Sequence, residues 1–230
     1  MKYKAVIFDL FGTLVDNFTH RDYYSVMAEI ADILKAPQKD FIRLWTSSFN
    51  DRVTGVHGDQ RESFIHICRE LKIKVSPEQI EQAFLLRMDF SRRTTVPRKG
   101  AVEVLAALRK DGYKVGLISD CTGEIPLIWD ETPFANLFDV KIFSCVVKTK
   151  KPDPSIYRMA TDQLKIKPSD CLYVGDGSSQ ELTGALKMGM HPVRIRDPKD
   201  LDEDQFMERE DDWAGIKITN LREVLDIVNT

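Results

Sequence analysis

Short apolar segments alternate with helical segments along the chain after about residue 95, and this alternation constrains the fold more than any other feature. Four segments are rich in Val, Ile, Leu and aromatic residues and end in polar or turn residues, as buried strands do: residues 113–119, 138–144, 171–175 and 191–195. Helical periodicity marks residues 101–110, 154–164, 180–188 and 221–228. Such alternation predicts a parallel sheet with helices on both faces.

The N-terminal part of the chain follows a different pattern. Residues 2–9 are typical of a strand of the same sheet, whereas residues 17–94 carry helical periodicity and no convincing strand. Helices are expected at residues 23–34, 39–49, 60–71 and 77–90, with a proline near the start of two of them. We therefore predict an α/β protein in which residues 1–16 and 95–230 form a Rossmann-like parallel-sheet core. Residues 17–94 form an all-helical domain inserted after the first strand.

Composition excludes several classes of partner. The 33 basic and 36 acidic residues give a formal charge of −3, which offers no electrostatic footprint for nucleic acid or an anionic membrane. The N-terminal apolar stretch is too short for a secretory signal, and no run approaches the length of a membrane span. We therefore expect a cytoplasmic, soluble protein. The acidic stretch at residues 200–213 is interpreted as a solvated loop or helix face.

Polar side chains stand where the predicted strands end. Asp9 follows the first strand, Ser119 ends the second, and Asp176 follows the strand at residues 171–175. Lys151 comes from the segment after residues 138–144, and Glu181 lies shortly beyond Asp176. Because the carboxyl ends of parallel strands share one edge of the sheet, we expect these side chains to converge.

This set of residue types suits chemistry on an anionic group. A carboxylate such as Asp9 can attack phosphorus or carbon and form a covalent intermediate. Attack on a phosphate requires charge neutralisation, for which Mg²⁺ held by Asp9 and Asp176 is suited, with Glu181 as a further ligand or a support of the water shell. Lys151 would supply positive charge to the transferring group, and Ser119 a directional donor.

The motifs resemble those of the haloacid dehalogenase superfamily, most of whose members are magnesium-dependent phosphatases. "FDLFGTL", "GLISD", "KPDPSIY" and "VGDGSSQELTGA" occur in the family's order between residues 2 and 196, and the insertion at residues 17–94 is similar to its small cap domain. The resemblance implies a small phosphorylated substrate, Asp9 as nucleophile, and the Phe11 carbonyl as a metal ligand. We expect Phe11, Thr13, Asp120 and, from the cap, Arg52 to contact substrate.

Phe11 departs from the phosphatase pattern. The family's phosphatases carry a second aspartate there, which protonates the leaving oxygen and activates water. Asp16, Asp120 or His57 are candidates to replace it.

Three alternatives stay open. One is a metal-independent 2-haloacid dehalogenase, a branch that has an aromatic residue at the Phe11 position but lacks the acid corresponding to Asp176. Another is a phosphonatase-like C–P hydrolase using Lys39, Lys72 or Lys74 of the cap. The last is a catalytically weak protein that binds a phosphorylated ligand or a partner. The sequence carries no readable signal for the oligomeric state.

Overall fold

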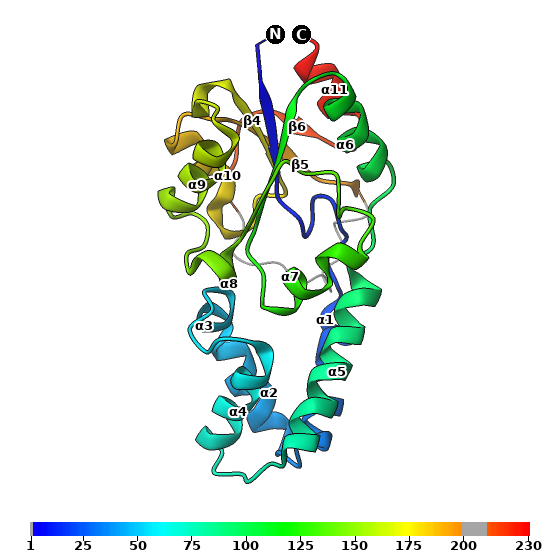
Figure 1. Ribbon diagram of the computed structural model, residues 1–230, viewed down its shortest axis with the longest axis vertical. Coiled ribbons are helices and arrows are strands. Elements are labelled where there is room, and N and C mark those ends of the chain that lie inside the picture. Colours follow the sequence, from blue (N-terminus) through cyan, green and yellow to red (C-terminus); the bar gives the residue numbers. More distant parts are fainter. Residues whose placement is uncertain (1, 199–210) are drawn as a thin grey trace.

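The core of the protein is a six-stranded parallel sheet (Figure 1). The computed structural model describes residues 2–198 and 211–230. The spatial order of the strands is β3-β2-β1-β4-β5-β6. Their bounds are β1 (Ala5–Phe8), β2 (Lys114–Ser119), β3 (Val140–Phe143), β4 (Cys171–Gly175), β5 (His191–Ile195) and β6 (Lys217–Ile218). The predicted fold class, an α/β protein with a parallel sheet, is confirmed.

Alternate residues of β1 face two separate cores, which is why the whole strand is apolar. Val6 and Phe8 belong to one buried cluster, and Ala5 and Ile7 to the other. The first cluster is covered by α6 (Ala101–Lys110) and α11 (Glu223–Val228), and the second by α9 (Pro154–Leu164) and α10 (Glu181–Lys187). Figure 1 shows these helix pairs on opposite sides of the sheet.

The inserted segment is helical throughout. It contains α1 (His20–Ile33), α2 (Gln38–Ser47), α3 (Phe49–Val53), α4 (Gln60–Glu70) and α5 (Pro77–Thr94). Side chains cap three of these helices: Thr19 caps α1, Asp59 caps α4, and Ser76 caps α5 in a reciprocal capping box with Gln79.

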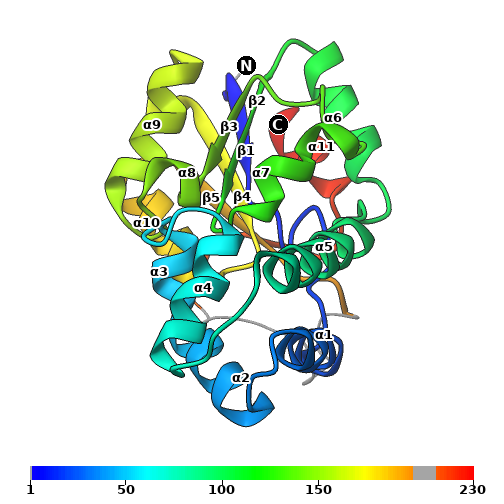
Figure 2. The same ribbon diagram turned by 60° about the horizontal axis from the view of Figure 1, so that its bottom comes forward.

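The chain leaves and re-enters the sheet region at neighbouring points, since Val15 forms an antiparallel bridge with Pro97. We keep residues 17–94 as our proposed cap domain. Its apolar side chains are continuous with one core of the sheet, since Met27 and Trp45 belong to the same buried cluster as Phe8. Figure 2 shows the cap helices below the carboxyl ends of the strands.

Two short helices of the core lie against the cap. The helix α7 (Glu124–Ile128) follows β2 and packs against α5, and α8 (Ser144–Val147) follows β3 and packs against α3. Neither helix was expected from the sequence pattern, nor was β6. The helix predicted at residues 39–49 is divided at Ser48 into α2 and the start of α3.

The acidic stretch was interpreted as solvated, and most of it, residues 200–210, lies outside the described residues. For Asp211 the interpretation is wrong. This side chain is buried and accepts hydrogen bonds from the backbone N–H and hydroxyl of Thr183 at 2.7 and 2.6 Å. Among the helices described, none is both long enough and apolar enough to cross a membrane.

Candidate active site

The predicted side chains meet at the end of the sheet that faces the cap. Lys151 Nζ donates to Asp9 Oδ1 at 2.5 Å and to Glu181 Oε2 at 2.6 Å. Asp176, at the end of the neighbouring strand, lies close enough that ligand oxygens of Asp9, Asp176 and Glu181 fall within 4.8 Å of one another. All four side chains are buried. The convergence expected from the strand ends is therefore present in the structure for this group.

Lys151 is held from several directions. Its ammonium is 1% exposed and contacts two carboxylates, while its backbone N–H donates to Asp120 Oδ1 at 3.1 Å. Burial acts against the ammonium, but the charges of Asp9, Glu181 and Asp120 outweigh it and raise the pKa of Lys151 well above its usual value. The side chain is therefore a permanent positive charge beside Asp9.

Glu181 has both carboxylate oxygens in hydrogen bonds. Oε1 accepts from the backbone N–H of Gly177 at 3.0 Å, and Oε2 accepts from Lys151 and from the Tyr173 hydroxyl at 2.8 Å. Gly175 leaves room for it, because a Cβ at that position would lie 2.2 Å from Glu181 Oε1. Burial, with the nearby charges of Asp9 and Asp176, raises the pKa of Glu181. Glu181 is thus arranged to hold Lys151, although it also belongs to the acidic cluster.

Asp9 keeps one carboxylate oxygen for another partner. Its Oδ2 is buried and, among the described residues, has no hydrogen-bond partner. Burial and the neighbouring Asp176 raise the pKa of Asp9 to about 6, against the opposing effect of Lys151.

The donor set fits a hard divalent cation. Three buried carboxylates lie close together, two of them in contact with Lys151, and oxygen ligands of this kind suit Mg²⁺. Gly12, at φ +78°, is required beside them, because a Cβ there would lie 2.1 Å from Asp176 Oδ2. The site therefore fits the predicted metal, and of the three carboxylates in the cluster Asp9 and Asp176 line the pocket.

A pocket connects this cluster with the cap. Its core wall includes Asp9, Phe11, Asp120, Lys151 and Asp176. Its cap wall is mostly aromatic and basic, and consists of Asn17, Phe18, Tyr23, Phe49, Arg52, Arg87, Phe90, Ser91 and Thr94. Three of the residues predicted to contact substrate therefore line the same pocket, Phe11 and Asp120 from the core and Arg52 from the cap.

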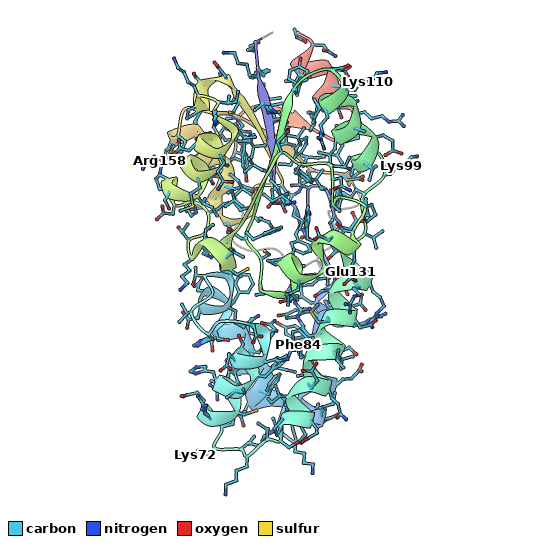
Figure 3. The ribbon with its side chains drawn as sticks, viewed as in Figure 1. Lys72, Phe84, Lys99, Lys110, Glu131 and Arg158 are labelled. Carbon is cyan, nitrogen blue, oxygen red and sulfur yellow. The ribbon has the colours of Figure 1, made fainter. Side chains whose placement is uncertain are left out.

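Other predicted residues lie elsewhere. Ser119 and Thr13 are fully buried and do not line the pocket, so their roles stay predictions. His57 and Asp16 are also outside the wall; Asp16 forms an ion pair with Arg98 at 2.6 Å. Lys72 extends from the end of the cap farthest from the sheet (Figure 3).

Sequence reasoning missed an ion pair that joins the cap to the core across the pocket. Arg87 of α5 lies 2.5 Å from Glu124 of α7, and both side chains are buried. Neither residue stands in a motif, and residues so far apart in the sequence carry no local sign of pairing. Tyr173 was also missed, although a tyrosine in an otherwise apolar strand was a visible signal that a buried hydroxyl needs a partner.

Comparison with known proteins places the chain in a family. Residues 3–189 match the haloacid dehalogenase-like hydrolase family. The chain is 25% identical over 233 residues to a protein named glyceraldehyde 3-phosphate phosphatase from Methanopyrus kandleri, covering 98% of this chain and 97% of that protein. It is 27% identical over 202 residues to (S)-2-haloacid dehalogenase 4A from Burkholderia cepacia, covering 84% and 82% of the two chains.

Solved structures share the fold. A HAD phosphatase from Thermococcus onnurineus superimposes with a TM-score of 0.68 at 22% identity, over 98% of this chain and 97% of that one. The protein belongs to the haloacid dehalogenase-like hydrolases, and it is an enzyme.

Proposed function

We propose that the protein is a magnesium-dependent phosphatase that hydrolyses a small phosphorylated molecule through an aspartyl-phosphate on Asp9. The observation that carries this proposal is the arrangement around Asp9: a carboxylate with one unpartnered oxygen, next to Asp176 and in contact with the buried ammonium of Lys151. The full-length relative named glyceraldehyde 3-phosphate phosphatase supports a small phosphorylated substrate.

Asp9, Asp176 and, as the family resemblance implies, the Phe11 carbonyl would hold Mg²⁺, which supplies charge neutralisation for an anionic substrate. A carboxylate oxygen of Asp9 attacks phosphorus, and the ester oxygen leaves with its bonding electron pair and takes a proton from water. A second water then attacks the aspartyl-phosphate and loses a proton, which releases inorganic phosphate and restores the carboxylate. Lys151 stabilises the negative charge of the phosphoryl group in both steps.

The roles of other side chains follow from their contacts. Glu181 and Asp120 keep Lys151 in place through its ammonium and its backbone N–H. Phe11 contributes an apolar wall and no proton. Hydrolysis of activated phosphates is therefore expected to be the easiest reaction for this site, because their leaving groups need little protonation.

A second candidate, a 2-haloacid dehalogenase, is favoured by Phe11 and by the dehalogenase relative. Asp176 argues against it, because without a cation Asp176 and Asp9 would be two like charges in one buried site.

One comparison separates the two candidates. Phosphate release from an aryl phosphate and halide release from a 2-haloacid are measured, each with Mg²⁺ and with a chelator. We expect phosphate release that the chelator abolishes. Halide release that survives the chelator, with no phosphatase activity, would overturn the proposal.

A further inference from the structure

Arg52 occupies an unusual position for a charged cap residue. It is 3% exposed, lies in the wall of the pocket that contains Asp9, and places its guanidinium 3.8 Å from the centre of the Trp45 ring. Its Nη2 donates to the Trp45 carbonyl at 2.7 Å, and its Nε donates to Ser48 Oγ at 3.3 Å. Within the described part of the chain, its Nη1 has no hydrogen-bond partner.

Two other buried arginines of the described residues, Arg87 and Arg98, have carboxylate partners, and Arg52 does not. Arg87 pairs with Glu124 and Arg98 pairs with Asp16, whereas no carboxylate of the described residues lies within ion-pair distance of Arg52. Glu124 is near enough to affect the pKa of Arg52, but its carboxylate is in contact with Arg87. Arg52, Arg87 and Glu124 together carry a net charge of +1 at the cap end of the pocket.

An unpaired buried cation is unfavourable unless something compensates it. Stacking on Trp45 and two neutral acceptors compensate part of the charge. The Nη1 nitrogen is buried without a hydrogen-bond partner among the described residues, and Arg52 lines a pocket that also contains Asp9. A ligand that places an anionic oxygen there would complete both the hydrogen bonding and the charge balance.

The helix that carries Arg52 is held against the core. Helix α3 packs on α8, and Gly55, just beyond α3, lies so close to the Cys145 carbonyl that a Cβ would come within 2.2 Å of it. The φ of Gly55 is +64°. The helix that carries Arg52 therefore lies at a close contact between cap and core, and Figure 2 shows α3 beside α8.

We propose that Arg52 binds a carboxylate at the end of the substrate opposite its phosphate, so that the enzyme prefers short phosphorylated carboxylic acids. A carboxylate is favoured over a second phosphate because its single negative charge matches the net charge of +1 formed by Arg52, Arg87 and Glu124. This inference rests on the proposed phosphatase function and adds the class of substrate to it.

Matched pairs of substrates test the inference. The O-phosphates of glycolate, 3-hydroxypropionate and 4-hydroxybutyrate are compared with ethyl, propyl and butyl phosphate, which replace the carboxylate by a methyl group. A hydrogen bond to a charged group contributes about 1.5–3 kcal/mol, so kcat/KM should favour the acid by about 10- to 100-fold in at least one pair. The pair with the largest ratio also reports the span between the two ends of the pocket.

Variants assign the preference to Arg52. Arg52→Gln should bring the ratio close to one, and Arg52→Lys should retain part of it, because lysine keeps the charge but not the planar fork. Arg61→Gln is the matched control: Arg61 also lies over an aromatic ring of the cap, Phe84, but it pairs with Glu81 and is outside the pocket. Its ratio should equal that of the wild type.

The outcomes distinguish the two proposals. Absence of phosphate release from an aryl phosphate by the wild type defeats the proposed function and this inference with it. Aryl phosphatase activity with ratios near one in every pair defeats the inference alone, and so does a ratio that survives in Arg52→Gln. If Arg52→Gln does not fold, Arg52→Lys and the wild-type ratios decide, and an unchanged ratio in Arg52→Lys overturns the assignment.

Discussion

The ammonium of Lys151 lies 2.6 Å from the carboxylate of Glu181, and both groups are buried within the site. Glu181 is the first residue of α10, and Lys151 precedes α9. The contact therefore links the starts of the two helices that cover one face of the sheet. We therefore propose that Glu181 acts on the reaction through Lys151.

Glu181→Gln should therefore lower kcat without a large change in the Mg²⁺ requirement. The amide removes one of the charges that orient Lys151, and we expect a loss of about 10- to 100-fold in kcat, the usual range for a partner that orients a functional group. Tyr173→Phe is the matched control, because it removes a hydrogen bond to the same oxygen but keeps the charge. A rise of tenfold or more in the half-saturating Mg²⁺ concentration of Glu181→Gln would instead make Glu181 a metal ligand.

Asp9→Asn should abolish turnover and leave the protein folded. The amide is a poor nucleophile, and the substitution relieves repulsion among the three buried carboxylates of Asp9, Asp176 and Glu181. We expect the melting temperature in chelator to equal or exceed that of the wild type. Circular dichroism and phosphate release provide the measurements, and near-normal turnover by Asp9→Asn would rule out Asp9 as the nucleophile.

Binding of Mg²⁺ should weaken below pH 6. The pKa of Asp9 in the metal-free protein is raised to about 6, so the group binds a proton below that pH and must release it to bind the cation. The apparent affinity should fall by about tenfold per pH unit below pH 6 and level off above it. Titration calorimetry from pH 5 to 8 measures this dependence.

Asp176→Asn provides the matched variant for the metal site. It should weaken binding at every pH and move the break in the pH profile to lower pH, because loss of the Asp176 charge lowers the pKa of Asp9. An affinity for Mg²⁺ that does not change between pH 5 and pH 8 would contradict the assignment of Asp9 as a ligand.

Local sequence signals were sufficient for most of the sheet and for the acidic cluster. The bounds of α6 and α9 agree with the prediction because their apolar faces are regular and Pro154 stands at the start of α9. Asp9 and Asp176 follow strands whose ends must share one edge of the sheet, so their proximity could be predicted without coordinates.

The remaining features depend on contacts between distant parts of the chain. Helices α7 and α8 are too short to show periodicity, and the two-residue β6 exists through its pairing with β5. Burial of Asp211 arises from its hydrogen bonds with Thr183, which no local pattern encodes. The pairing of Arg87 with Glu124 likewise requires the cap to be packed on the core.

Phe11 should make the reaction strongly dependent on the leaving group. Its ring lies in the pocket wall and contacts Phe18 edge-to-face, with 6.2 Å between centroids, so it supplies no proton where a second acid would act. General acid–base help contributes about 10²- to 10⁴-fold, so aryl or acyl phosphates should be turned over faster than alkyl phosphates by a factor in that range. With an activated substrate, hydrolysis of the aspartyl-phosphate becomes the slow step, and stopped-flow measurements should show a burst of phenolate.

Two variants at Phe11 test this explanation. Phe11→Asp should raise alkyl phosphate turnover and shrink the burst. Phe11→Asn, whose side chain is similar in size to aspartate but is not an acid, should do neither. If the wild type already hydrolyses alkyl and aryl phosphates at similar rates without a burst, another group such as Asp120, which lies in the same wall, provides the proton.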